Sequence, residues 1–427
     1  QGAFTAAGRW LVGLGLVAAI GLDVTMSRSV AVRHGRLGAA ATALAIWITV
    51  RDVADGSLDG GPARVGLLVG VAAVVVIVLR SQPLDRATIA SAVLAIGVGV
   101  AASGWVGVVW HIEPWAMRGT STWRASSTLT YPNAAAAITV GAALLAISAR
   151  TVRPRSVWHA IATTALLIGA VATQSRAGAV AATFGAAVLV HVAGPRRVIG
   201  ATAGPALGAV VACAGLAPGL SVDRSEQPAS AVVGLLVGLG IAAASTRVPA
   251  VVQRRLATIA ATAVVFVLGA AAFGRARWWS SDRLSLTSSD RRGTNAAAFD
   301  VLQDHALVGV GPGDLRVVFP TPGGLVTTTL VHDEYLQLAV ELGIIGAALA
   351  AVCACLTMRS LAASRHRSGD RWMWNGAVAA LTALAVHSAF DFLWHIPAVV
   401  LVVAAIVALG CAPASSVPNT NHERHHT

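Results

Sequence analysis

The sequence contains no lysine, because all 31 of its basic residues are arginine. Charged residues of any kind are scarce, at 12% of 427 residues, which is about half the share in soluble domains. This scarcity excludes an ordinary soluble protein. The formal charge of +12 would indicate a nucleic-acid partner in a soluble chain. Here the arginines lie between apolar runs, so no nucleic-acid partner is expected.

Signals for metals, cofactors and disulfides are also lacking. The four cysteines lie in apolar runs without metal-binding or disulfide spacing. There is no Walker lysine, no HExxH sequence and no DxD-like carboxylate pair, so we expect no metal site and no cofactor. The glycine-rich GVGPG (309–313) has no accompanying strand or lysine and predicts a tight turn rather than a phosphate cradle. The chain starts at Gln1 without Met and without a charged leader, so no signal peptide is expected in this sequence; a missing or trimmed N-terminus is the alternative explanation of this start.

Apolar residues, by contrast, make up 56% of the chain and fall into thirteen runs. Many of these runs reach about 17–22 residues, enough to cross a bilayer core of about 30 Å. The sequence predicts an all-α, polytopic integral membrane protein with about 12–13 transmembrane helices. The second and third runs are short for a crossing and are predicted to be tilted or partly re-entrant. The predicted spans are 10–24, 38–50, 65–79, 87–106, 134–149, 157–172, 177–193, 198–216, 230–246, 256–273, 335–358, 373–390 and 396–412.

Arginine gathers in alternate connections between these spans, and cytoplasmic loops carry such an excess. The opposite connections (107–132, 174–176, 217–229 and 274–334) are therefore predicted to face outward. The longest of them is polar and is predicted to be an extracytoplasmic catalytic loop containing short helices. The predicted organisation is a transmembrane part (1–273), this loop (274–334), C-terminal transmembrane helices (335–412) and a disordered cytoplasmic tail (413–427).

Arginine dominates the polar residues predicted to face outward. An arginine at a membrane boundary can extend to the lipid headgroups, which is the ordinary interpretation of any single one. Several arginines on one face can instead bind a pyrophosphate through forked hydrogen bonds and stabilise it as it leaves. The candidates are Arg124, Arg176, Arg291 and Arg292, of which the last two open a predicted amphipathic helix capped by Ser288 or Ser289.

One histidine in the long loop, His332, lies at the start of a predicted span. It is either an interfacial residue or a general base. The general-base interpretation has a physical reason: a helix N-terminus disfavours imidazolium and keeps the ring able to accept a proton. Asp333 and Glu334 are first-turn carboxylates. Glu334 has two further interpretations: it orients the imidazole, or it binds a sugar hydroxyl.

These motifs resemble those of the O-antigen ligase and polymerase family of bacterial envelope glycosyltransferases. The resemblance covers roughly residue 123 to the end of the last span. It rests on the order and spacing of separated motifs: Arg124 with Tyr-Pro-Asn133, Ser175-Arg176-Ala-Gly, Ser289-Asp-Arg291, GVGPGDL, HDEYLQLAVELGIIG and HSAFDFLWHIPA (387–398). Three positions depart from the family pattern: Asp333 stands for asparagine, Asn295 for tryptophan and Asp290 for glycine.

The resemblance implies a metal-independent, inverting glycosyltransferase of the bacterial cytoplasmic (inner) membrane. Such an enzyme moves a glycan from a polyprenyl (undecaprenyl) pyrophosphate carrier to an acceptor hydroxyl on a glycan, lipid or protein, at the extracytoplasmic face. Catalytic roles then fall to His332 as base and to Arg176 and Arg291 at the pyrophosphate. The candidate substrate-binding residues are Arg124, Asn133, Arg292, Glu334 and Tyr335. The motifs do not separate a ligase from a polymerase, and the alternative function is a flippase or transporter of lipid-linked glycans.

Overall fold

The computed structural model describes residues 29–54, 61–81, 83–248, 289–321, 324–366 and 370–412. This part of the chain is mostly helical, with 12 helices. The helices are α2 (Ser29–Ala54), α3 (Gly61–Arg80), α4 (Pro83–Val109), α5 (Pro132–Val152), α6 (Val157–Ala172), α7 (Arg176–Ala193), α8 (Pro195–Leu216), α9 (Pro228–Ser245), α11 (Ser289–Asp304), α12 (Glu334–Ser364), α13 (Arg371–Ser388) and α14 (Pro397–Cys411). Two antiparallel hairpins complete it: β1 (Ala116–Arg118) with β2 (Trp123–Ala125), and β3 (Val317–Thr321) with β4 (Gly324–Thr328).

The helical fold class is confirmed. Two of the thirteen predicted spans, 10–24 and 256–273, lie outside the described residues, as does the predicted tail. Each of the other eleven coincides with one helix. Most ends agree within four residues, but α2 begins nine residues before its predicted span and α12 ends six residues after its own. Within the described residues, seven helices are long and apolar enough to cross a membrane, and α6 and α14 are shorter apolar helices.

The two runs predicted to be short are longer as helices. α2 has 26 residues and α3 has 20, so at 1.5 Å per residue even the shorter one is about 30 Å long. The difference arises because each helix continues past its apolar run into polar residues, such as Arg51 and Arg80 in the last turns. The helices are therefore longer than the apolar runs within them, and the expectation that these two segments are tilted or partly re-entrant stays a prediction.

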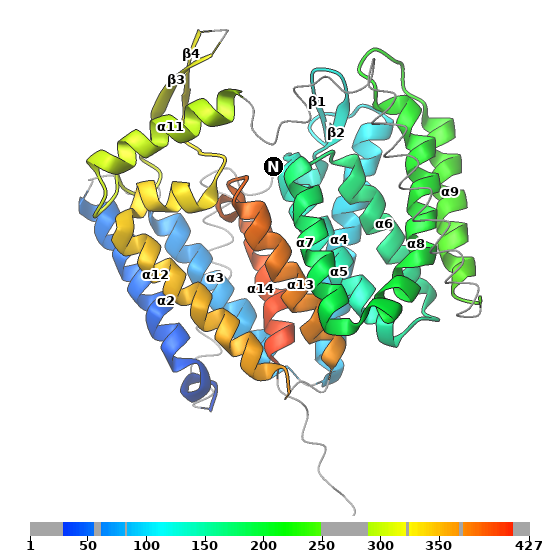
Figure 1. The fold of residues 1–427 in the computed structure, drawn as a ribbon, viewed down its shortest axis with the longest axis horizontal. Helices are drawn as coiled ribbons and strands as arrows, with labels where there is room; N and C mark the ends of the chain where they lie inside the picture. Colours follow the sequence, from blue (N-terminus) through cyan, green and yellow to red (C-terminus); the bar gives the residue numbers. More distant parts are fainter. Residues whose placement is uncertain are drawn as a thin grey trace, which may run out of the picture.

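The helix α5 lies in the interior of the bundle and packs against α4, α6, α7, α8, α13 and α14. Nearly all of its residues are buried, and most of them are small: the segment reads PNAAAAITVGAALLAISARTV. Small side chains let neighbouring helices approach closely on every face, which explains how one helix accommodates six neighbours. Figure 1 shows α13 and α14 beside α5, with α2, α3 and α12 as a second group on their other side.

The connections predicted to share one side meet at one end of the helices, where Figure 1 shows both hairpins and α11. The Thr122 hydroxyl donates to Gln174 Oε1 over 2.7 Å, joining the 107–132 connection to the α6–α7 turn. His111 Nε2 lies 2.8 Å from the carbonyl oxygen of Gly219, and this contact joins the 107–132 connection to the α8–α9 connection. The grouping agrees with the arginine pattern. Which side of a membrane this end faces stays a prediction.

The described part of the 274–334 loop forms a small subdomain at this end. The predicted amphipathic helix is confirmed as α11, whose Ala298 packs with Leu315, Val317, Val331 and Val340. The predicted cap at Ser288 lies outside the described residues. The β3–β4 hairpin was not predicted from the sequence.

The helix α12 breaks at Gly343, where the backbone has φ +67° and ψ −176°. Its first part lies across the end of the bundle and its second part runs along the other helices (Figure 1). The GVGPG segment forms the predicted tight turn with positive φ at Gly309, Gly311 and Gly313. It packs against the break, because the amide of Gly311 donates to the Glu341 carbonyl over 2.9 Å. The predicted single span 335–358 is therefore two helical segments.

Replacing Gly343 with alanine should destabilise the protein by about 3 kcal/mol or more, because only glycine adopts this backbone region without strain. A Cβ there would also meet the backbone of Leu307 and Val308. Thermal unfolding in detergent measures the effect. The matched control is Gly240→Ala, since Gly240 is helical and a Cβ there meets nothing within 4 Å. That variant should shift stability by about 1 kcal/mol at most, toward greater stability. Equal unfolding midpoints for the two variants would contradict the prediction.

Candidate active site

A buried carboxylate, Asp391, is the centre of the polar residues at this end. It lies in the connection between α13 and α14 and is 0% exposed. The Tyr131 hydroxyl lies 2.7 Å from its Oδ1 and 2.8 Å from its Oδ2. The Phe392 amide donates to Oδ1 over 3.0 Å, and Asn133 Nδ2 donates to Oδ2. Asp391 therefore accepts hydrogen bonds from two chain segments more than 250 residues apart in sequence.

The fourth partner of Asp391 is His332. Its Nδ1 lies 3.2 Å from Asp391 Oδ1, and its side chain is 33% exposed. The imidazole also contacts Phe392, with ring centroids 5.2 Å apart. Within the described part of the chain, His332 Nε2 has no hydrogen-bond partner. One ring nitrogen is thus oriented by the protein, and the other is left for an external group.

The charge on Asp391 fixes which nitrogen carries the proton. Burial raises the pKa of the Asp391 carboxyl, but hydrogen bonds from His332, Tyr131 and Asn133 outweigh burial and bring the pKa below its ordinary value. Burial, and then the nearby Asp391, raise the pKa of the Tyr131 phenol well above its usual range, so the hydroxyl remains a donor. Because an ionised carboxylate only accepts, His332 Nδ1 carries a proton, and in the neutral ring the lone pair is then on Nε2.

One arginine, Arg124, is linked to this pair through Asn133. Arg124 of β2 donates from a terminal NH₂ group to Asn133 Oδ1 over 3.2 Å, and from Nε to the Thr173 carbonyl over 3.0 Å. Thr173 belongs to the turn that leads into α7, whose first residue is the exposed Arg176. A continuous set of contacts therefore runs from this turn through Arg124, Asn133 and Asp391 to His332.

The two arginines of α11 differ in placement. Arg291 is half-buried, and its positive charge acts on both Tyr131 and His387, so it lies near the Asp391 carboxylate. Arg292 is exposed on the helix. Of the two, Arg291 is the one that the structure brings to the site, whereas the predicted role of Arg292 in substrate binding stays a prediction.

The two remaining candidates, Glu334 and Tyr335, face another set of partners. Glu334 is 1% exposed; its Oε1 lies 2.9 Å from His395 Nδ1, and its Oε2 accepts from the Trp394 amide over 2.7 Å. The interpretation that Glu334 orients the His332 imidazole is therefore wrong, because Asp391 does so. The Tyr335 hydroxyl donates to the Ala385 carbonyl over 2.8 Å, and its ring meets the Trp394 ring edge to face. Substrate contacts of both residues stay predictions.

Asp333 has the first-turn role expected of it. As the residue before α12, its Oδ1 accepts from the amides of Tyr335 and Leu336, which caps the helix. His332 is thus fixed at its C-terminal side by a helix cap and at its ring by Asp391.

Sequence reasoning missed the pairing of His332 with Asp391, the hydrogen bond from Tyr131 to Asp391 and the contact of His395 with Glu334. The signal was present in part: Asp391 is a lone carboxylate between two apolar spans, and such residues carry function more often than structure. His387, in the same motif, is 1% exposed, and neither ring nitrogen has a hydrogen-bond partner among the described residues.

These features define a helical protein with apolar helices long enough to cross a membrane and with a histidine–carboxylate pair flanked by arginines at one end. Among the described residues, no group of three or more histidine, cysteine or acidic side chains is arranged to hold a metal ion. Comparison with protein-family models and with curated proteins found no match.

Proposed function

We propose that this protein is a multi-pass membrane glycosyltransferase that moves a glycan from a polyprenyl pyrophosphate carrier to an acceptor hydroxyl. The seven apolar helices support membrane insertion, and the arginine pattern favours an active site on the extracytoplasmic face of a bacterial cytoplasmic membrane. The observation that carries the proposal is the His332–Asp391 pair, which lies at the same end of the bundle as Arg124, Arg176 and Arg291.

In the proposed reaction His332 is the general base. Its Nε2 takes the proton of the acceptor hydroxyl while that oxygen bonds to the anomeric carbon of the donor glycan. The imidazole becomes positively charged in this step, and the ionised Asp391 at Nδ1 stabilises that charge. The acceptor attacks from the side opposite the leaving group, so the configuration at the anomeric carbon is inverted.

The bond that breaks joins the anomeric carbon to a phosphate oxygen, and the electron pair leaves with the polyprenyl pyrophosphate. Arginines stabilise this departing anion through charge-assisted hydrogen bonds. Arg176 adds a second contribution, since it begins α7 and the N-terminus of a helix attracts anions. Arg124 is fixed by Asn133 and Thr173, which favours a role in positioning the donor.

Replacing Arg176 or Arg291 by lysine should lower kcat/KM for transfer by about 10-fold or more, because an ammonium group cannot reproduce the forked pair of hydrogen bonds. Steady-state kinetics with a varied concentration of the lipid-linked donor measures the effect. Arg197→Lys is the control, since this exposed arginine lies at the start of α8 and is separated from Arg176 by the whole length of α7. Unchanged donor affinity and turnover in both lysine variants would contradict pyrophosphate binding by these arginines.

The function itself is tested with purified protein in detergent and a polyprenyl-pyrophosphate oligosaccharide as the only substrate, with a chelator present. A ladder of products that requires His332 would establish a polymerase. No ladder, but transfer after a lipid or protein acceptor is added, would establish a ligase. No transfer to any acceptor, with a native repeat unit as donor, would reject the proposal.

The alternative is a flippase or transporter of lipid-linked glycans. One observation favours it: Arg64, Glu334, Glu341 and His395 form a buried group of ionisable side chains, and ion-coupled transporters use such groups. These residues lie at the end of the helices beside the His332 segment rather than midway along them, which favours the enzyme. If the protein moves a fluorescent donor lipid across the bilayer of vesicles, and His332→Ala moves it equally fast, the transporter would be supported.

A further inference from the structure

One side chain, the amide of Gln174, joins β2 to the turn between α6 and α7. The Thr122 hydroxyl donates to Gln174 Oε1 over 2.7 Å, and Gln174 Nε2 donates to the Trp123 carbonyl over 2.9 Å. A third hydrogen bond joins the same two segments, since Arg124 Nε donates to the Thr173 carbonyl over 3.0 Å. Three consecutive residues of one segment therefore bind two consecutive residues of the other.

The orientation of this amide is fixed by its partners. The Trp123 carbonyl can only accept, so the NH₂ group of Gln174 must face it, and the oxygen is left for the Thr122 hydroxyl. Trp123 is also held on another side, because its ring stacks on His111 with centroids 4.7 Å apart. His111 in turn contacts the Gly219 carbonyl. The segment that carries Arg124 is thus fixed from two connections at this end of the bundle.

The backbone of Gln174 is in the left-handed region, with φ +49°, which a residue other than glycine seldom adopts. Among the described residues, the other three non-glycine residues with positive φ all lie in the 107–132 connection. Two residues after Gln174, α7 begins at Arg176, and the Ser175 hydroxyl caps it by accepting from the Gly178 amide over 3.0 Å. Strain of this kind is typical of functional sites. Glycine would relieve it but would lack the amide.

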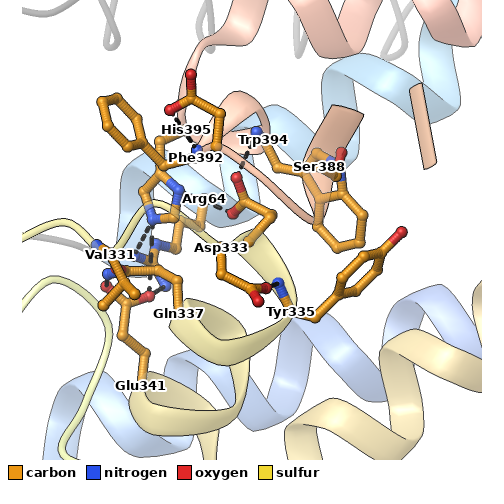
Figure 2. Close-up of polar contacts among 12 residues, drawn as sticks. Arg64, Val331, Asp333, Tyr335, Gln337, Glu341, Ser388, Phe392, Trp394 and His395 are labelled. Atoms are coloured by element: carbon orange, nitrogen blue, oxygen red, sulfur yellow. Dashed lines mark hydrogen bonds and ion pairs between the residues drawn. The ribbon is translucent and has the colours of Figure 1, made fainter. Parts of the chain in front are cut away.

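A second glutamine has the same kind of role on the side of the proposed base. Gln337 is 0% exposed; its Oε1 accepts from the Val331 amide over 2.6 Å, and its Nε2 donates to the Thr329 carbonyl over 3.2 Å. Figure 2 shows Gln337 meeting Val331, the residue that precedes His332. Gln337 therefore fixes the segment of the base, whereas Gln174 fixes the segments of two arginines.

We propose that Gln174 is a positioning residue for the donor, which sets the placement of Arg124 relative to Arg176 so that both guanidinium groups meet one pyrophosphate. This inference rests on the proposed function. Two forked contacts bind the same pyrophosphate together only if their separation matches it, and a misplacement of about 1 Å can cost about 10²-fold. Gln174 acts through the backbone of β2 and of the α7 start, not by contact with the substrate.

The kinetic test compares Gln174→Ala and Gln174→Gly with wild type. Both variants should raise KM for the lipid-linked donor about 10-fold and leave KM for the acceptor unchanged. Turnover should change little, because the pyrophosphate already carries its charge in the bound donor. Gln337→Leu should show the opposite split, with a lower kcat and an unchanged donor KM. Gln227→Ala is the control and should behave as wild type, since this exposed side chain makes no cap for α9.

Thermal unfolding separates positioning from a merely structural role. Gln174→Gly should unfold at a higher temperature than Gln174→Ala, because glycine adopts φ +49° without strain. A structural role would make donor KM follow this difference in stability, whereas a positioning role predicts the same raised KM in both variants. A donor KM equal to that of wild type in both variants, or one that recovers in the glycine variant, would overturn the inference.

A binding measurement needs no transfer. Calorimetry in detergent with undecaprenyl pyrophosphate alone should give a Kd about 10-fold higher for both Gln174 variants than for wild type. If binding weakens in this way but no transfer is ever detected, the positioning role stands and the proposed function fails. If transfer is detected and both variants bind as wild type does, the function stands and this inference fails. No binding to the wild-type protein would reject both.

Discussion

Protein with His332 replaced by alanine should transfer glycan about 10²–10⁴-fold more slowly than wild type, since this is the usual contribution of a general base. The structure gives the reason for a value in this range: Nδ1 contacts Asp391 and Nε2 is free of partners in the described chain. Single-turnover rates with saturating donor and acceptor measure the loss. Donor binding should change little, because the arginines that are proposed to contact the pyrophosphate remain.

The control for this variant is His366→Ala, an exposed histidine at the opposite end of α12. It should leave both rate and binding unchanged. A His332→Ala protein that binds donor normally and turns over near the wild-type rate would remove His332 from the mechanism.

Replacing Asp391 by asparagine should be almost as harmful, with an expected loss of about 10²–10⁴-fold in turnover. An amide offers one accepting oxygen where the carboxylate has two, and four donors compete for it. If the new NH₂ group faces His332, the imidazole must accept at Nδ1 and carry its proton on Nε2. A ring in that tautomer cannot take a proton from the acceptor, and the same change in a Ser-His-Asp triad costs about 10⁴-fold.

The sharpest form of this prediction is a double variant. Because Asp391 is proposed to act through His332, His332→Ala combined with Asp391→Asn should be no slower than His332→Ala alone. Asp223→Asn, at an exposed residue after η2 (Ala217–Leu220), is the control for a lost carboxylate and should keep full activity. Thermal unfolding of each variant separates lost turnover from lost structure. Multiplicative losses in the double variant would show that the two residues act independently.

The helices could be predicted from the sequence because the physical signal for them is local. Runs of apolar residues mark α4 to α9 and α12 to α14. The alternation of arginine along the chain predicts which of their connections share one end. The signal fails where structure depends on a single dihedral angle. Nothing in the composition around Gly343 distinguishes the break in α12 from the interior of a long span.

The site could be predicted only in part, for a related reason. His332, Arg124 and Asn133 were identified from their motifs, and the structure links them through Asp391. The link itself joins positions 131–133, 332 and 391, and single-sequence patterns carry no information about such distant contacts. Glu334 was assigned to His332 because it is its neighbour in sequence, whereas the helix that begins there turns Glu334 toward His395.

The α13–α14 connection has a consequence for engineering. Asp391 and His395 are four residues apart on one short segment, and each contacts partners on different elements. A side chain can adjust to a new neighbour, but a segment fixed at two points cannot change its length between them. Epitope tags, fluorescent labels and protease sites are therefore best kept out of residues 389–396. The turn between α5 and α6, at residues 153–156, has exposed positions at the opposite end of the helices and is the better place for them.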